Sequence, residues 1–217
     1  MTAADTPMQL SGNGLLDFSA NNIVAELSWS ELRWPLAGET TQISSQRGNI
    51  NVAGALDDWQ VSGNVELAAA GVDDGRFVIA GGGDRDHAAV RINNGNVLGG
   101  TITGEVSASW RDARPWSAEL NLAGIRPEAV WPESAWAGRL SGHVDARGQA
   151  EPLQIDLELN EVQGQFMGRA LTANGAVEIT RDSITANRFR LTHGGNDVLL
   201  DGSMDSPAGV NFSARAA

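Results

Sequence analysis

The chain has 217 residues, of which 41% are hydrophobic and 19% charged, and its formal net charge is −12. This composition is typical of a folded protein, and the excess of acid excludes a broad nucleic-acid-binding surface, because phosphate binding requires clustered cations. All 15 basic residues are arginine and cysteine is absent, so lysine- or thiolate-dependent catalysis, disulfides and cysteine metal sites are excluded as well.

The amino-terminal stretch MTAADTPMQL carries neither a positive flank nor an apolar run. It is therefore not a signal peptide. No stretch approaches the roughly 18 uninterrupted apolar residues that a membrane-spanning helix needs. We expect no segment of this chain to cross a membrane by itself.

Alternation of apolar and polar residues dominates the chain and predicts strands with one apolar face. The first clear example is GNINVAGAL (48–56), followed by GTITGEVSASW (100–110) and LQIDLELN (153–160). In the last of these, Leu153, Ile155, Leu157 and Leu159 alternate with polar residues. About a dozen strands of this kind follow one another, separated by glycine, asparagine and aspartate.

Two turn signals and one helical signal interrupt this pattern. VDDGRF (72–77) and INNGNV (92–97) contain Asp-Gly and Asn-Gly pairs, which predict tight hairpin turns. RPEAVWPESAW (126–136) is the one helical candidate, opened by Pro127 and limited by Pro132. A loosely repeated hairpin of uneven length indicates one continuous domain over residues 1–217 rather than a strict solenoid.

The predicted fold class is all-β: an elongated, curled, antiparallel-type sheet with a hydrophobic interior groove and almost no helix. No helices are predicted to cover the apolar face, so the sheet must curl on itself, pair with another sheet or hold an apolar ligand. Abundant glycine favours curling, because it permits bulges and bends. The candidate groove residues are Ile102, Val106, Leu120, Leu122, Leu140, Val144, Ile155, Leu157, Leu159, Val177, Ile179, Phe189, Leu191, Val198 and Leu200.

Several polar clusters resemble reactive sites but have simpler interpretations. His143 and Asp145 share a strand face without the further ligands of a metal site. Asp57-Asp58 and Asp73-Asp74 stand where strands end, as turn formers rather than as opposed glycosidase acids. GGGDRDH (81–87), which partly matches a calcium-binding nonapeptide, and HGGND (193–197) are both interpreted as turns. We therefore predict no catalytic residue, metal or cofactor.

The aromatic composition is unusual, with seven tryptophans and no tyrosine. A stacking platform for carbohydrate is one interpretation. The favoured one is that these side chains fill the apolar face or cap its ends, with Trp131 and Trp136 nearest an opening. A carbohydrate-active enzyme would also need convergent carboxylates, which the sequence does not indicate.

Three segments resemble the repeated pieces of the TamB family within the AsmA-like group: residues 96–148, 157–204 and 26–38. The resemblance rests on a degenerate hairpin rhythm over most of the chain, without invariant catalytic residues. It implies a long periplasmic protein of Gram-negative bacteria, anchored in the inner membrane, whose sheet forms a β-taco. On this basis the chain is an excised middle segment of a longer protein.

The resemblance also implies a function in phospholipid movement toward the outer membrane and in outer-membrane protein assembly, with the Omp85-type barrel protein TamA as the partner of the full-length protein. The first hypothesis is thus a non-enzymatic hydrophobic conduit that shields acyl chains. The alternative is a chaperone-like scaffold that templates outer-membrane strands by β-augmentation without carrying lipid. The unpaired edges of the sheet also predict self-association of the fragment.

Overall fold

The computed structural model describes residues 8–34, 43–69, 72–111, 113–129, 137–149, 151–205 and 209–216. Within these residues it contains fourteen strands and one short 3-10 helix. The elements are β1 (Gln9–Asp17), β2 (Asn22–Trp34), β3 (Ile43–Ala55), β4 (Asp58–Ala69), β5 (Val72–Gly83), β6 (His87–Val97), β7 (Gly100–Ser109), β8 (Pro115–Ile125), η1 (Pro127–Ala129), β9 (Gly138–Gln149), β10 (Gln154–Phe166), β11 (Arg169–Thr180), β12 (Ser183–His193), β13 (Asn196–Asp205) and β14 (Gly209–Ala216).

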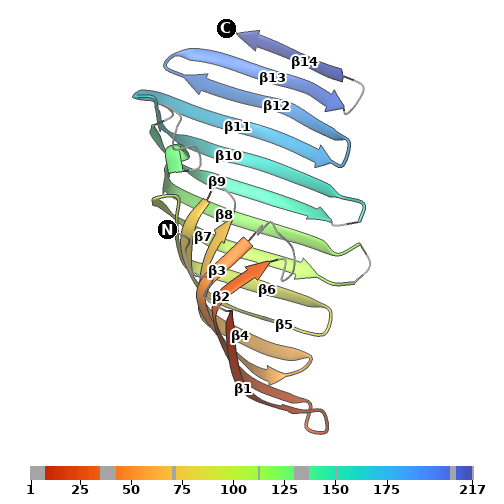
Figure 1. The fold of residues 1–217 in the computed structure, drawn as a ribbon. Coiled ribbons are helices and arrows are strands. Elements are labelled where there is room, and N and C mark those ends of the chain that lie inside the picture. The colour runs from red at the N-terminus through yellow and green to blue at the C-terminus, as the bar shows by residue number, and fades with distance from the viewer. Residues whose placement is uncertain are drawn as a thin grey trace.

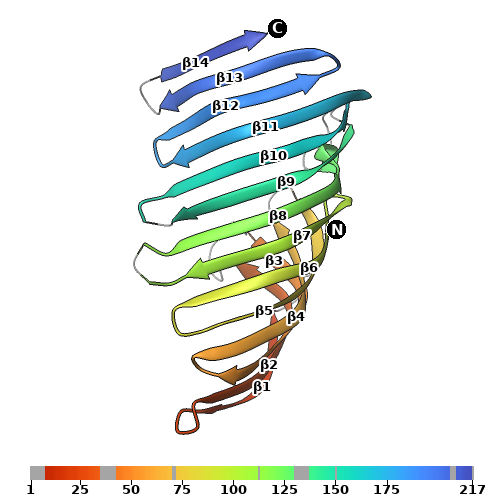
Figure 2. The same cartoon turned by 180° about the vertical axis from the view of Figure 1, so that it is seen from behind.

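The strands form one antiparallel sheet in which each strand pairs with its neighbours in the sequence, from β1 at one edge to β14 at the other. The sheet twists and curls without closing (Figures 1 and 2). The order follows from the short connections, because antiparallel neighbours can be joined by tight turns whereas parallel ones need a long crossover. The predicted all-β, curled, antiparallel fold with almost no helix is confirmed.

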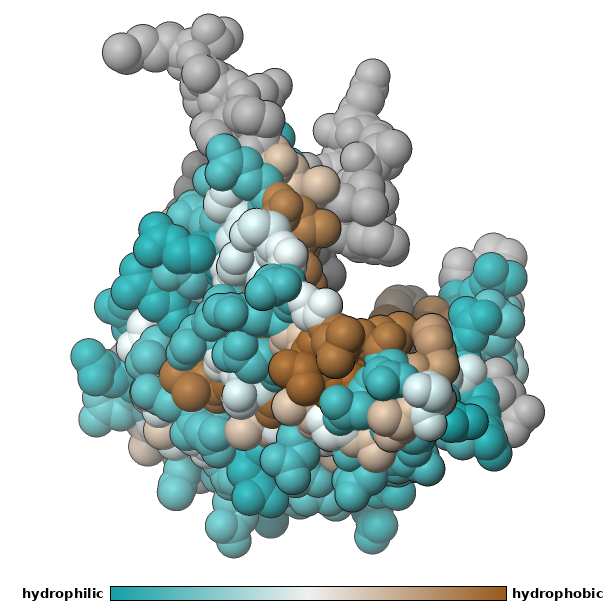
Figure 3. Space-filling view, turned by 90° about the horizontal axis from the view of Figure 1, so that it is seen from below, coloured by the Kyte–Doolittle hydropathy of each residue, from teal (hydrophilic) through white to brown (hydrophobic). Residues whose placement is uncertain are grey.

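Cross-strand register places the apolar residues of successive strands on one side of the sheet. Residues directly opposite each other share a face, and Leu157 lies opposite Val177 on β11 and Ala146 on β9. We call the side that carries Leu157 and the residues in register with it the apolar face, and the other side the polar face. Seen from below, hydrophobic side chains gather in a recess of the surface, and mostly hydrophilic ones surround them in this view (Figure 3).

Aromatic side chains of the apolar face lie over glycines of the neighbouring strand. Trp29 pairs with Gly48, and Trp59 with Gly83. Phe77 pairs with Gly95 in the same way, and Trp116 with Gly148. In all four pairs a β-carbon on the glycine would clash with the aromatic ring. Because glycine has no side chain, the ring can occupy the space beside it, and the ring then covers the backbone of the neighbouring strand.

Both predicted hairpin turns at 72–77 and 92–97 are wrong, because Asp74-Gly75 lies inside β5 and Asn94-Gly95 lies inside β6. The register of β6 shifts between Ile92 and Gly95, so the second pair forms a bulge instead of a turn. The two glycines are needed for packing: a β-carbon on either one would meet the ring of Phe77. The chain instead reverses beyond the end of the strand, and after β6 it does so at Leu98-Gly99.

The predicted helical segment 126–136 contains a single 3-10 turn, Pro127–Ala129, in its described part. The rest of it, including Pro132 and the predicted opening residues Trp131 and Trp136, lies outside the described residues. Glu128 accepts a hydrogen bond from the backbone N–H of Gly138 at 3.1 Å. This contact ties the turn to the start of β9.

Three of the most buried apolar residues lie on β10 and β11. Val162, Leu171 and Ala173 are 8%, 9% and 5% exposed. Packed against them are Leu140, Leu159, Phe166, Phe189 and Leu191. A single sheet has little interior, so this cluster arises where side chains of adjacent strands cover one another.

We predict that Gly48→Ala destabilises the chain, because the new β-carbon takes space that the Trp29 ring occupies. The free energy of unfolding should fall by about 1–3 kcal/mol, measured by chemical denaturation. Gly12→Ala is the matched control, since its β-carbon would first meet the movable Leu27 Cδ1, at 3.2 Å. An equal loss in both variants would show that Trp29 packing on Gly48 is not the cause.

Candidate functional site

All fifteen candidate groove residues lie on the apolar face. Register connects them strand by strand: Ile102 faces Leu122 and Leu120 faces Val144. Farther along the sheet Ile155 faces Ile179, Phe189 faces Leu200, and Leu191 faces Val198. The structure thus brings together on one surface residues that are nearly 100 positions apart in the chain.

The fifteen residues share one degree of exposure but differ in their contacts. Each is half-buried, neither enclosed nor fully open to solvent. Leu140, Leu159, Phe189 and Leu191 pack against the buried cluster around Val162. Those four therefore stabilise the sheet as well as line its surface, while Leu157 and Val177 are not part of that cluster.

Sequence reasoning missed the centre of this cluster, Val162, Leu171 and Ala173, and for Val162 the cause is a bulge in β10. Leu159 and Val162 lie on the same face although three positions separate them, since register shifts between them and Glu161 takes a φ of 52°. Strict alternation from Leu157 would place Val162 on the polar face. One sequence signal could have indicated that Val162 is buried: it is the one apolar residue between polar neighbours, Asn160, Glu161 and Gln163.

The apolar face also extends to the amino-terminal strands, which the candidate list did not include. In register there are Leu27 opposite Ile50, Val52 opposite Val61, and Ile79 opposite Ile92. The face therefore runs continuously over β2 to β13.

His143 and Asp145 lie on the polar face and contact each other, with 3.0 Å between His143 Nε2 and Asp145 Oδ1. The other ring nitrogen, Nδ1, is 3.0 Å from Asn121 Oδ1, and Asn160 Nδ2 donates to Asp145 Oδ2 at 2.9 Å. These bonds join β8, β9 and β10 across the sheet. Among the described residues no group of three or more His, Cys, Asp or Glu is arranged to hold a metal.

Three tryptophans whose side chains are described, Trp29, Trp59 and Trp116, occupy apolar-face positions. Indole nitrogens find partners within the sheet: Trp29 Nε1 donates to Ser45 Oγ at 2.7 Å, and Trp59 Nε1 to the carbonyl of Asp84 at 3.0 Å. Trp110 follows β7 and is 49% exposed. The interpretation that tryptophans fill the apolar face holds for these three.

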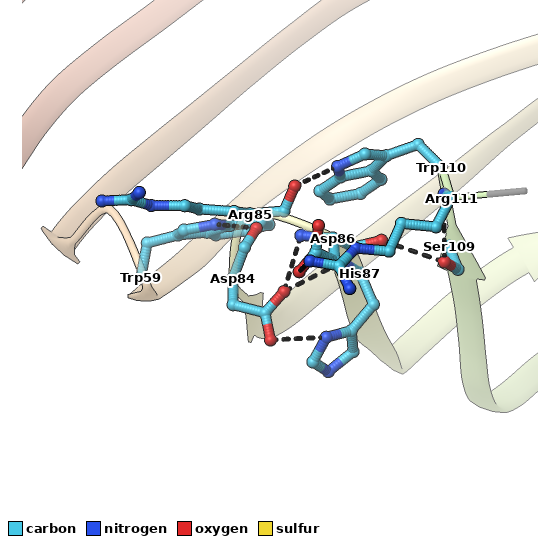
Figure 4. A network of polar contacts seen from close by, with 8 residues as sticks. All are labelled: Trp59, Asp84, Arg85, Asp86, His87, Ser109, Trp110 and Arg111. Carbon is cyan, nitrogen blue, oxygen red and sulfur yellow. Dashed lines mark hydrogen bonds and ion pairs between the residues drawn. The ribbon is translucent and has the colours of Figure 1, made fainter.

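The segment GGGDRDH comprises the end of β5, the turn at residues 84–86 and the first residue of β6. The turn is held by contacts with the next turn of the same rim (Figure 4). Trp110 Nε1 donates to the carbonyl of Arg85, and the Arg111 guanidinium pairs with Asp86. Ser109 Oγ also donates to the carbonyl of Asp86, at 3.0 Å. The contacts are structural and leave no converging set of reactive groups.

Asp84 organises this turn by accepting backbone hydrogen bonds. Asp86 N donates to Asp84 Oδ1 at 2.7 Å and His87 N does so at 3.0 Å, while His87 Nδ1 lies 2.8 Å from Oδ2. The bond from Asp86 is the main reason that the pKa of Asp84 lies below its ordinary value, and partial desolvation opposes it.

The other polar clusters also lie at turns or in strands. HGGND contains the two-residue turn Gly194-Gly195, with φ values of 58° and 92°, between β12 and β13. Beside it the guanidinium of Arg190 donates to Asp197, which lowers the pKa of that carboxyl. Asp57 lies in the β3–β4 turn and Asp58 begins β4, whereas the side chains of Asp73 and Asp74 lie outside the described part.

Comparison with models of protein families gives a match over almost the whole chain. A family model described as the TamB N-terminal domain matches residues 4–215. No curated protein and no solved structure matches the chain. Within the described residues no helix is long and apolar enough to cross a membrane.

We predict that Asp84→Ala loosens the rim turn, because two backbone donors lose their acceptor. The indole N–H signals of Trp59 and Trp110, which donate to carbonyls of this turn, should shift and exchange faster in NMR spectra. Asp182→Ala, in the β11–β12 turn, is the control and should leave both signals in place.

The same contacts predict a pH dependence. A depressed pKa means that the stabilisation by ionised Asp84 is fully present above the ordinary value of 3.8 and is lost as pH falls through the lower folded-state value. The two indole signals should hold their positions down to pH 4 and move only below it. Movement centred above pH 4 would contradict this assignment.

Proposed function

The chain belongs to the TamB family, and we propose that its apolar face shields phospholipid acyl chains during transport between the inner and outer membranes. In this proposal the whole of residues 1–217 is one stretch of a longer hydrophobic conduit in the periplasm, and no residue reacts. The observation that carries it is the continuity of the apolar face over β2 to β13, with family membership as its support.

The direction of the face suits movement along the sheet. Apolar side chains from successive strands stand side by side, as in the row Leu120, Val144 and Leu159 on β8, β9 and β10. An acyl chain lying across the strands meets similar side chains at each step. A uniform apolar surface offers it no deep local minimum, which favours sliding over storage.

Burial of the acyl chain supplies the driving force. Each buried methylene contributes about 0.8 kcal/mol, so a chain of sixteen carbons gains roughly 12 kcal/mol over its exposure to water. The sheet gains as well, because an uncovered apolar face is an aggregation liability. Phospholipid head groups remain in water at the open side of the curled sheet.

Family membership supports a proposal for the partners and the location of the chain. We place the chain in the periplasm of a Gram-negative bacterium, within a full-length protein that is anchored in the inner membrane. That protein would meet the Omp85-type partner TamA at the outer membrane, and its conduit would support outer-membrane protein assembly.

We predict that Leu157→Asp reduces the phospholipid carried by the purified chain at least several-fold, because a carboxylate on the apolar face must lose its hydration when a lipid covers it. Gln163→Asp adds the same charge on the polar face of the same strand, and should leave lipid content unchanged. Lipid extraction with mass spectrometry measures the effect. Circular dichroism of both variants separates lost binding from lost folding.

Photo-crosslinkers test the conduit against the scaffold without adding charge. A crosslinker at Leu157 should capture lipid in cells. A crosslinker at Leu10, on the edge strand β1, should not capture protein as its main product. Protein adducts at the edge together with no lipid at Leu157 would replace the conduit by a scaffold that templates strands by β-augmentation.

A further inference from the structure

The polar face carries a hollow of about 660 Å³ that the proposed conduit does not use. It crosses β1 to β6, on the half of these strands away from the β1–β2 turn. Its floor is a row of short side chains in mutual register, Ser11, Ser28, Asn49 and Asn64. Longer side chains of the adjacent row, including Arg47, Glu66 and Arg76, surround it.

The floor offers hydrogen-bonding groups that the protein itself leaves open. Ser11 Oγ and Ser28 Oγ are 2.7 Å apart, and Asn64 Nδ2 donates weakly to Asn49 Oδ1 at 3.4 Å. Within the described part of the chain this leaves the Asn49 amide NH₂ and the Asn64 side-chain carbonyl without a partner. A donor and an acceptor on neighbouring strands therefore point to the same solvent-filled space.

The wall brings positive charge to a chain whose net charge is −12. Arg76 Nε lies 3.3 Å from Glu66 Oε1, so that arginine is partly neutralised. Arg47 makes no ion pair with any described residue. Two arginines against one glutamate give the hollow a net positive character, which complements an anion.

Aromatic stacking contributes nothing here, because Trp29 and Phe77 direct their rings to the apolar face, over Gly48 and Gly95. A ligand of this site must be held by hydrogen bonds and charge, and must be larger than a single inorganic anion to fill the volume.

We propose that this hollow binds a carboxylate-bearing saccharide, with Arg47 on the carboxylate and the serine and asparagine row on ring hydroxyls. Hydroxyl groups are both donors and acceptors, and so match the open donor of Asn49 and the open acceptor of Asn64. A peptide fits less well, since its backbone groups need strand partners, and every strand under the hollow except the edge β1 is already paired on both sides. The site is separate from the lipid-shielding face and does not depend on it.

The test is a titration of the purified chain, followed by NMR and calorimetry, with tetragalacturonate as the probe. Saturable binding should perturb the side-chain amide signals of Asn49 and Asn64 and should weaken with added salt. Arg47→Gln should weaken binding roughly 10-fold, the loss expected for one charge-assisted hydrogen bond. Arg147→Gln, on the polar face of β9 outside the hollow, is the matched control and should bind as the parent chain does.

Three comparison probes decide the ligand class. Neutral maltotetraose should bind far more weakly than tetragalacturonate if charge is required. If an acidic hexapeptide binds as tightly as tetragalacturonate, the saccharide assignment is overturned. If inorganic phosphate binds as tightly, the hollow is a simple anion site and the assignment is likewise overturned. Absence of saturable tetragalacturonate binding, or unchanged affinity in Arg47→Gln, would overturn the proposal.

Discussion

Cross-strand register is the constraint on which the rest of this structure depends. A slip of one residue in any strand would move its apolar side chains to the polar face. The strands are long, up to 13 residues, and several contain an extra residue that would itself cause such a slip. A residue in the left-handed backbone conformation accommodates the extra residue at each bulge. These residues are Glu161 in β10 and Arg188 in β12, with φ values of 52° and 46°. Each bulge restores the phase of alternation beyond it and adds curvature.

The same register decides how the sheet manages without a second layer. An aromatic ring over a glycine covers the backbone of two strands with one side chain, and it recurs at Trp29, Trp59, Phe77 and Trp116. These pairs shield the sheet without needing an opposing element. The residues near Val162 stabilise the fold and lie on the same face that the proposed conduit would use.

Alternation in the sequence was sufficient to predict the fold class and to place Leu157, Ile179 and Leu200 on one face, because each stands in a stretch of unbroken period two. It failed where a local signal has two physical meanings. Gly75 and Gly95 resemble turn residues, yet they serve to accommodate Phe77 from within strands. Val162 falls out of phase because the bulge at Glu161 is set by pairing with β9 and β11, which no single strand reveals. The polar hollow was missed for a related reason: its floor residues are ordinary serines and asparagines until register aligns them.

The two faces of the sheet impose different demands on sequence, and this separates their chemistry. The apolar face needs only hydrophobic side chains of suitable size, so the proposed conduit would discriminate little among acyl chains. The polar face is heterogeneous: Glu105, Glu119, Asp145 and Glu158 are successive neighbours in register across β7 to β10. Like charges directly opposite each other are destabilising, and the ion pair between Arg91 and Glu105 counters this repulsion at one end of the row. The acidic row repels anions, whereas the hollow over β1 to β6 carries Arg47 and Arg76. An anionic ligand approaching the outside of the sheet is thus directed toward one end of it, by charges that leave the apolar face untouched.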